Sequence, residues 1–170
     1  MKTLIARKLV TLIRYLEGTS FLRLRRFCYR KLLKKMGRPV SIGTAVFIME
    51  PEEIEIGNNV SIHEFCVISG FGGVKIGNDV SIATGTKIFS STHPFDDKEV
   101  KIREGVLQKL PVEIGDNVWV GANVVITPGV KVGSGVVIGA GAVVTKDLEK
   151  NGVYAGVPAL LIKKRFSQEK

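Results

Sequence analysis

The sequence has 170 residues, which suits a single domain with at most a small appendage, and 45% of them are hydrophobic, enough for a substantial core. The net charge of +9 is concentrated at one end. Residues 1–36 hold eleven Lys or Arg against Glu17 alone, a net +10, so the rest of the chain carries −1. We expect no nucleic-acid partner, because the body of the chain is not basic and contains no zinc-finger, RNP-like or helix-turn-helix pattern. Cys28 and Cys66 lack metal-like spacing, which indicates a reducing compartment, and the N-terminal apolar stretches are too short to span a bilayer.

Residues 1–39 are predicted to form a basic amphipathic helical cap. Apolar residues recur there at helical spacing, and Gly18 followed by Thr19-Ser20 indicates a break between two helices. Pro39 ends the segment. The simpler interpretation is a cap over the open end of the next structural unit, where edge strands would otherwise invite association. The sharper interpretation adds peripheral contact of residues 1–36 with an anionic membrane.

Residues 40–147 are organised by a period of six. An aliphatic residue recurs at every sixth position, at Ile114, Val120, Ile126, Val132, Ile138 and Val144. A second small or branched residue follows four places later, at Val118, Val124, Val130, Val136 and Ala142. Gly or Asn, which best tolerate the positive φ of a tight corner, stand between them at Asn117, Asn123, Gly129, Gly135 and Gly141. The pattern predicts triangular coils of three hexapeptides, stacked as parallel strands at a spacing of about 4.8 Å.

The upstream half carries the same period with three breaks. The aliphatic positions there are Ile42, Ile48, Ile56, Ile62, Ile68, Ile76, Ile82 and Ile88. The breaks follow Ile48, Ile68 and Ile88, which are 20 residues apart, so each interval is one coil of 18 residues plus an insertion of two. All three insertions should therefore leave the prism at one corner. The third is a loop at residues 91–111, and a long loop in a strict repeat is usually functional.

Residues 148–170 form a C-terminal extension. After Asp147 the chain leaves the coil, returns through residues 155–158 and finishes in a basic tail, for which we expect a short helix.

Four stretches resemble the hexapeptide-repeat acyltransferases: STHP at 91–94, VEIGDNVWVGANVVITPGVKVG at 112–133, IGAGAVVTKD at 138–147 and AGVPA at 155–159. The resemblance covers about residues 40–165 and is nearest to the maltose and galactoside O-acetyltransferases and to acetyltransferases of surface polysaccharides. It implies a left-handed parallel β-helix, from which the long, basic N-terminal cap of this chain departs. The fold expected is therefore all-β, a left-handed parallel β-helix with an N-terminal α-helical segment and a short C-terminal helical tail. The resemblance also implies a homotrimer with three active sites between neighbouring prisms, with acetyl-CoA as co-substrate and no metal.

The same resemblance implies roles for single residues. His93 matches the catalytic histidine of the family. The cofactor-binding positions are Trp119 and Ala122 beside the pantetheine arm, Ala140 and Thr145 further along it, and Lys146 and Lys163 near the phosphates and adenine. The sequence departs from the family where the acceptor is held: His63 stands in place of an asparagine and Phe71 in place of a carboxylate. The donor half of the site therefore carries over better than the acceptor half.

Acetyl transfer to a hydroxyl requires a base that takes the proton and donors that stabilise the oxyanion. Imidazole, with an ordinary pKa of about 6.5, suits the first task, and backbone N–H groups at a coil corner suit the second. Asp96 and Asp97 either orient His93 or are solvated loop charges. His63 is a structural or substrate-contact residue rather than a second base.

The function predicted is an acetyl-CoA-dependent O-acetyltransferase of a sugar or glycan hydroxyl, located in the cytoplasm and, for a lipid-linked acceptor, at the inner face of the membrane. Its closest rival is an N-acetyltransferase of a nucleotide-linked amino sugar. A γ-carbonic-anhydrase-like metal site needs three histidines at a subunit interface, and the chain has only His63 and His93. A purely structural scaffold is the remaining alternative, against which the STHP loop argues.

Overall fold

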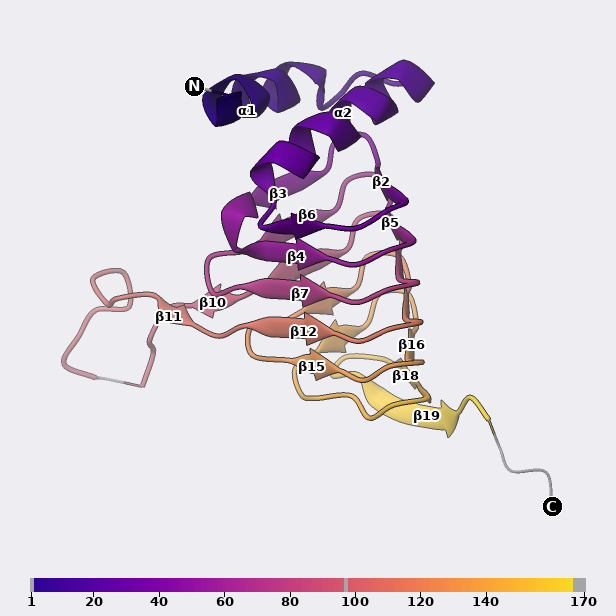
Figure 1. Cartoon of the computed structure of the whole chain (residues 1–170). Helices are drawn as coiled ribbons and strands as arrows, with labels where there is room; N and C mark the ends of the chain where they lie inside the picture. The colour runs from indigo at the N-terminus through magenta and orange to yellow at the C-terminus, as the bar shows by residue number, and fades with distance from the viewer. Residues whose placement is uncertain (1, 97, 167–170) are drawn as a thin grey trace.

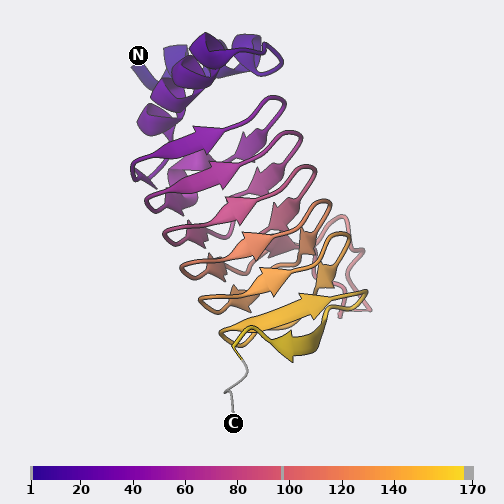
Figure 2. The same cartoon turned by 90° about the vertical axis from the view of Figure 1, so that its right-hand side faces the viewer.

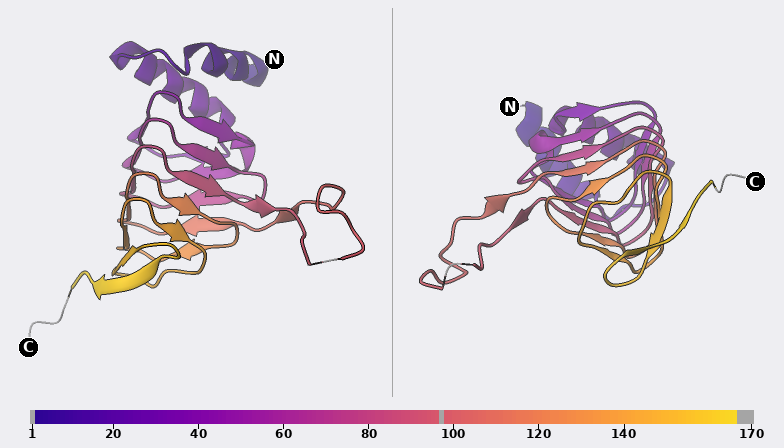
Figure 3. Two further views of the ribbon diagram at one scale, coloured as in Figure 1. Left: turned by 180° about the vertical axis from the view of Figure 1, so that it is seen from behind. Right: turned by 90° about the horizontal axis from the view of Figure 1, so that it is seen from below.

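The computed structural model of the chain describes residues 2–96 and 98–166. It is a left-handed parallel β-helix, called the prism below. In Figure 1 the front strands run from left to right while the coils descend from the N-terminal end, which gives the coil its left hand. Figure 2 shows the coils stacked one on another. Each coil adds strands to three parallel sheets, which we call faces A, B and C (Figure 3). The fold predicted from the six-residue period is therefore confirmed.

Face A consists of β1 (Lys35–Met36), β4 (Ile54–Ile56), β7 (Val74–Ile76), β12 (Val112–Ile114) and β15 (Lys131–Val132). Face B consists of β2 (Val40–Ile42), β5 (Val60–Ile62), β8 (Ser81–Ile82), β13 (Trp119–Val120), β16 (Val137–Ile138), β18 (Gly152–Ala155) and β19 (Leu160–Lys164). Face C consists of β3 (Phe47–Met49), β6 (Val67–Ser69), β9 (Lys87–Phe89), β14 (Val125–Ile126) and β17 (Val143–Val144). Parallel pairing therefore runs from β1 to β18, beyond the range 40–147 expected for the β-helix.

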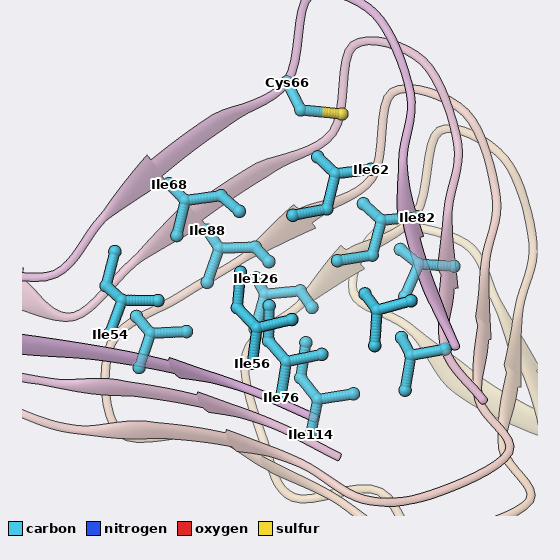
Figure 4. Packing of buried hydrophobic residues seen from close by; sticks show 14 of the residues in the cluster. Ile54, Ile56, Ile62, Cys66, Ile68, Ile76, Ile82, Ile88, Ile114 and Ile126 are labelled. Atoms are coloured by element: carbon cyan, nitrogen blue, oxygen red, sulfur yellow. The ribbon is translucent and has the colours of Figure 1, made fainter. Parts of the chain in front are cut away.

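The core is a set of aliphatic columns, because equivalent positions of successive coils are in register. Ile62 pairs with Ile82, and Ile68 with Ile88. Figure 4 shows these isoleucines stacked inside the prism with Cys66 beside them. All the aliphatic residues that the period places inside are buried. Burial of Ile or Val at each coil removes apolar surface from water at about 25 cal/mol per Å², which is the main stabilisation of the fold.

Most corners turn through a residue with positive φ, and the sequence predicted five of these residues. The residues are Asn117, Asn123, Gly129, Gly135 and Gly141 in the C-terminal half. A ladder of side-chain oxygens also supports the corner between faces A and B, the A–B corner. The backbone N–H of Arg38 donates to Asn58 Oδ1 (2.9 Å), that of Asn58 to Asn78 Oδ1 (2.8 Å), and that of Asn78 to Asp116 Oδ1 (2.6 Å). Backbone groups that face solvent at this corner are thus satisfied within the protein.

The three breaks in the period all lie at the C–A corner, where the chain passes from face C to face A. The 3-10 turn η1 (Pro51–Glu53) follows β3, residues 70–73 follow β6, and residues 91–111 follow β9. Because β3, β6 and β9 are neighbours on face C, the insertions are stacked. The prediction that they share one corner is confirmed.

Helices α1 (Lys2–Ile13) and α2 (Thr19–Leu32) cover the first coil, with the break at Gly18 that the sequence predicted. Arg25 of α2 is buried and fastens the cap. Its guanidinium donates to the carbonyl oxygens of Ile42 in β2 (3.1 Å), Leu16 (2.7 Å) and Ile13 (3.3 Å). Burial lowers the pKa of Arg25, an effect that nearby Tyr29 and Glu64 oppose. Among the described helices, neither is long and apolar enough to cross a membrane.

The expectation of a C-terminal helical tail is wrong. Residues 152–155 form β18, which continues face B below β16, and β19 folds back antiparallel against β18. The chain turns between them through Gly156, whose φ is +97°, and Pro158. The apolar run Leu160, Leu161 and Ile162 suits a strand as well as a helix, and the free edge of β18 supplies the pairing partner. Residues 167–170 lie outside the described residues.

Candidate active site

The insertion that carries His93 is an arm that projects from the C–A corner (Figures 1 and 3). At its base β10 (Ser91–Thr92) pairs antiparallel with β11 (Gln108–Lys109). The backbone N–H of Leu110 donates to Ser90 O (2.9 Å) as the chain returns to face A. His93 follows β10 directly, so its exposed side chain stands off the wall of the prism. A partner that approaches this corner can therefore reach it.

A hydrogen bond within the arm fixes the tautomer of His93. Nδ1 lies 3.1 Å from the carbonyl oxygen of Ile102. A carbonyl only accepts, so Nδ1 must carry the proton and neutral His93 keeps its lone pair on Nε2. This is the arrangement a general base needs, because the carbonyl also supports the imidazolium that forms when Nε2 takes a proton. Asp96 is exposed on the arm, and Asp97 lies outside the described residues.

The turn that holds Ile102 depends on a glycine. The N–H groups of Glu104 and Gly105 both donate to Lys101 O (2.8 and 3.2 Å). A Cβ on Gly105 would lie 3.1 Å from Pro94 Cδ and still closer to Pro94 Cγ. The missing side chain therefore lets the turn pack beside His93. Sequence reasoning missed Ile102 and Gly105. Gly105 is the only glycine in residues 91–111, a signal that could have found it, whereas nothing in the sequence marks the Ile102 carbonyl.

Buried Ser90 anchors the base of the arm. Its Oγ donates to Ser69 O (2.6 Å) and accepts from the N–H of Gly72 (2.9 Å). These contacts tie the insertion at 70–73 to the longer one below it. Phe71 belongs to the shorter insertion and is half-buried, with Lys109 Nζ from the base of the arm 4.8 Å from its ring centroid. The predicted acceptor residue Phe71 is therefore on the same corner as His93, and the cation–π partner Lys109 is a residue that sequence reasoning missed.

Thr145 and Lys146 also lie at the C–A corner. Val144 is in register with Ile126, and Ile126 with Ile88, so they leave face C two coils below the arm. Both side chains are exposed.

His63, Ala122 and Ala140 lie instead at the corner between faces B and C, the B–C corner. Ile62, Ile82, Val120 and Ile138 are in register, so His63 stands in one column above Ala83, Gly121 and Gly139. Its Nδ1 is 3.9 Å from Glu64 Oε2, and its side chain is 49% exposed. Below it the corner carries only Gly and Ala side chains at residues 121–122 and 139–140. Such a surface lets a long ligand lie close to the backbone.

Trp119 and Lys163 share one outward row of face B. Trp119 pairs with Val137, Val137 with Val153 and Val153 with Lys163. The Trp119 side chain is 57% exposed and Lys163 is exposed at the lower end of the face. The predicted site residues thus form two sets within one chain. His93, Phe71, Thr145 and Lys146 are at the C–A corner, and His63, Ala122, Ala140, Trp119 and Lys163 are at the B–C corner or on face B.

Both cysteines are free thiols buried in the core, and burial is the first cause that raises the pKa of Cys66 and of Cys28. Across residues 2–96 and 98–166, His, Cys, Asp and Glu side chains form no group of three that could hold a metal ion.

Comparison with known proteins agrees with the fold. The family model "Bacterial transferase hexapeptide (six repeats)" matches residues 111–146. The galactoside O-acetyltransferase of Escherichia coli K12 is 34% identical over 141 residues, which cover 83% of this chain and 68% of that protein. The chain belongs to the hexapeptide-repeat acetyltransferases. It spans 47% to 68% of the lengths of five curated relatives of this family that it matches.

Solved acyltransferase structures superpose on 85% or more of the chain. A maltose O-acetyltransferase from Clostridium difficile 630 has a TM-score of 0.85 at 31% identity, over 98% of this chain and 87% of its own. A galactoside acetyltransferase in complex with coenzyme A has a TM-score of 0.83 at 30% identity, over 97% and 81%. An N-acyltransferase from Bacillus cereus, solved with a dTDP-linked amino sugar and coenzyme A, has a TM-score of 0.64 at 26% identity, over 85% and 90%.

Proposed function

We propose that the protein is an acetyl-CoA-dependent O-acetyltransferase that acts on a sugar or glycan hydroxyl, with His93 as general base and direct transfer. The observation that carries this proposal is the hydrogen bond from His93 Nδ1 to Ile102 O, which leaves Nε2 free on an exposed arm. A histidine on a surface loop with no role in catalysis would not need a fixed tautomer.

The chain's own residues contribute to the reaction as follows. Nε2 of His93 accepts the acceptor's hydroxyl proton as the oxygen attacks, and Nδ1 keeps its bond to Ile102 O. The thioester supplies an activated acyl carbon and a good leaving group, so direct transfer needs no covalent enzyme intermediate. After the C–S bond breaks, Nε2 returns the proton to the departing thiolate, which restores neutral His93. Backbone N–H groups at a coil corner stabilise the oxyanion.

The proposed donor residues fit a long, thin, anionic ligand. The small side chains of Ala122 and Ala140 leave the B–C corner smooth, Trp119 offers an exposed aromatic face beside it, and exposed Lys146 and Lys163 supply cations for phosphates. The relatives solved with coenzyme A support this assignment.

We also propose that the active unit is a homotrimer. The base and most of the donor residues lie on different corners of one prism, so a site that uses both needs the C–A corner of one copy against face B and the B–C corner of the next. Face A suits the solvent side of such an assembly. Its outward row alternates in charge from coil to coil, and the successive residues are Lys35, Glu55, Lys75, Glu113 and Lys131.

The rival N-acetyltransferase is supported by the Bacillus cereus neighbour with its amino-sugar ligand. The two functions share a donor site and differ in the acceptor. A coenzyme A release assay with galactosides, maltose, glycans and nucleotide-linked amino sugars separates them. We expect a higher kcat with hydroxyl acceptors than with the amino sugars. Turnover only with amines would replace the proposal by its rival, and no acetyl-CoA turnover with any acceptor would count against both. The two free, buried thiols support the proposal of a reducing, cytoplasmic location, so the assay is run under reducing conditions.

A further inference from the structure

The outer side of the helical cap carries exposed apolar side chains, which a cap that only closes the prism does not need. Helix α1 buries Ala6, Val10 and Ile13 at helical spacing. Leu12, on the other side of the helix, is 74% exposed. Phe27 of α2 is 60% exposed. We call the exposed side chains Leu4, Ile5, Lys8, Leu12, Arg23, Phe27 and Lys31 the cap surface.

An apolar groove of about 200 Å³ lies within the cap surface, between α1 and α2. It is lined by Ile5, Ala6, Leu9, Phe27, Cys28 and Lys31. Lys31 Nζ is 5.8 Å from the centre of the Phe27 ring, so a cation borders an otherwise apolar slot. The groove has room for a few methylene groups, with the ammonium group beside them.

Within residues 2–96 and 98–166, only two cations of the cap, Arg7 and Lys34, form ion pairs. Arg7 pairs with Glu52 (2.7 Å) and Lys34 with Glu55 (3.0 Å), on the side of the cap that meets the first coils. On α2 the pKa of Arg30 is lowered by desolvation and then by the positive charges of Arg38 and Arg26.

We propose that the cap surface docks on an anionic lipid bilayer, with Leu12 and Phe27 entering the interfacial region and Lys8, Arg23 and Lys31 at the level of the lipid phosphates. An exposed mixture of apolar and basic side chains is the chemistry that a charged bilayer recognises. Nucleic acid would use the cations but leaves Leu12 and Phe27 without a role. In the proposed homotrimer, with prism axes side by side, three cap surfaces face one membrane, so their contributions combine. The combined action of three cap surfaces rests on the proposed function, whereas vesicle binding by a single cap surface does not.

The test is flotation of the full chain with vesicles of phosphatidylcholine containing about 30% phosphatidylglycerol, compared with phosphatidylcholine alone. The expected result is binding to the anionic vesicles only and release at about 1 M NaCl, where screening is strong. Leu12→Glu with Phe27→Glu should lower the partition coefficient at least about tenfold. Lys8→Glu with Lys31→Glu should lower it by at least about fivefold per residue, since each change removes one positive charge and adds a negative one.

Matched controls lie at the other end of the prism. Ile162→Glu removes a 63% exposed apolar side chain of β19, and Lys150→Glu removes an exposed cation, and neither should change vesicle binding. No binding by the wild type, equal binding to neutral vesicles, or binding by both cap variants that matches wild type would overturn the proposal. So would cap variants that fall apart into monomers, which would make this surface a subunit contact, or binding of an RNA oligonucleotide without vesicle binding. Flotation needs no turnover, so a failure to bind vesicles would not count against the acetyltransferase function. In the same way, a lack of coenzyme A release would not count against membrane docking.

Discussion

The A–B and C–A corners of the same prism are built in opposite ways. At the A–B corner the coils turn alike at Gly57, Gly77, Gly115 and Gly133, and successive coils contact each other so closely there that glycine is required. A Cβ on Gly77 would lie 2.7 Å from the carbonyl carbon of Gly115 in the next coil, with the Asp116 carboxylate nearer still. At the C–A corner the chain leaves the coil three times, in insertions that grow from a short 3-10 turn to the arm at 91–111.

The difference shows how a strict repeat can carry chemistry. Stacked coils share their hydrogen bonds, so insertions at different corners would interrupt the contacts between coils at more than one corner. Stacking all the insertions at one corner leaves the ladder of Asn58, Asn78 and Asp116 at the A–B corner intact. The C–A corner can then hold His93 on an arm that projects from the prism. Rigidity and function are thus divided between corners rather than between domains.

The largest effect is expected at the C–A corner. His93→Ala should lower turnover by about 10²–10⁴-fold, the usual contribution of a general base, with the fold and coenzyme A binding unchanged. The measurement is coenzyme A release at saturating acceptor, with circular dichroism and size-exclusion chromatography as checks of the fold. His63→Ala, the matched histidine change at the B–C corner, should raise the acceptor KM and leave turnover within about tenfold. Near wild-type turnover in His93→Ala would remove His93 from the role of base.

The A–B corner should be the more sensitive one for stability. Gly77→Ala should cost about 2–3 kcal/mol, because its Cβ would meet the backbone of the coil below. Gly141→Ala is the matched control at the B–C corner: its φ is +72° but nothing lies within 4 Å of the new Cβ, so only the backbone strain of about 1 kcal/mol is expected. Denaturant unfolding at one fixed protein concentration measures both. A larger loss for Gly141→Ala would show that φ, not coil contact, limits the corners.

The repeat explains how far the fold could be predicted from the sequence. A period of six fixes which side chains point inward, so burial of residues such as Ile114 and Ile138 follows from spacing alone, as does the common corner of the three insertions. The arm has no period, and the contact between His93 and Ile102 O depends on a backbone carbonyl, which no residue type reveals. The apolar run at residues 160–162 suits a helix or a strand, and only the free edge of β18, which the fold supplies, decides for the strand. The two sets of site residues lie on different corners of the prism. Residue spacing in one sequence does not show which corners of neighbouring copies meet.

A third effect concerns the two lysines proposed to bind the donor, Lys146 at the C–A corner and Lys163 on face B. Lys146→Glu together with Lys163→Glu should raise the KM for acetyl-CoA by about tenfold or more, because two phosphate-facing cations become repulsive. The increase should be much smaller for the dephospho form of the donor, which lacks the 3′-phosphate. Lys150→Glu, a neighbouring exposed lysine to which no role is assigned, is the control. Equal increases for both donors would show that neither lysine meets the 3′-phosphate.

The smallest effect is expected on face A, which has neither the tight contacts of the A–B corner nor the arm of the C–A corner. Glu113 lies between Lys75 and Lys131 in the outward row, and its Oε1 is 4.0 Å from Lys131 Nζ. Glu113→Lys would put three like charges in a column and should cost about 0.5–1 kcal/mol at low salt, because these side chains are exposed and screened by water. The cost should nearly vanish at about 1 M NaCl, where the Debye length falls to about 3 Å. Adding Lys131→Glu restores one alternating pair and should recover about half of the loss. Denaturant unfolding of the two variants at both salt concentrations measures this. A loss that salt does not change would mean that Glu113 acts through packing, and face A would then be another tightly packed part of the prism instead of its solvent side.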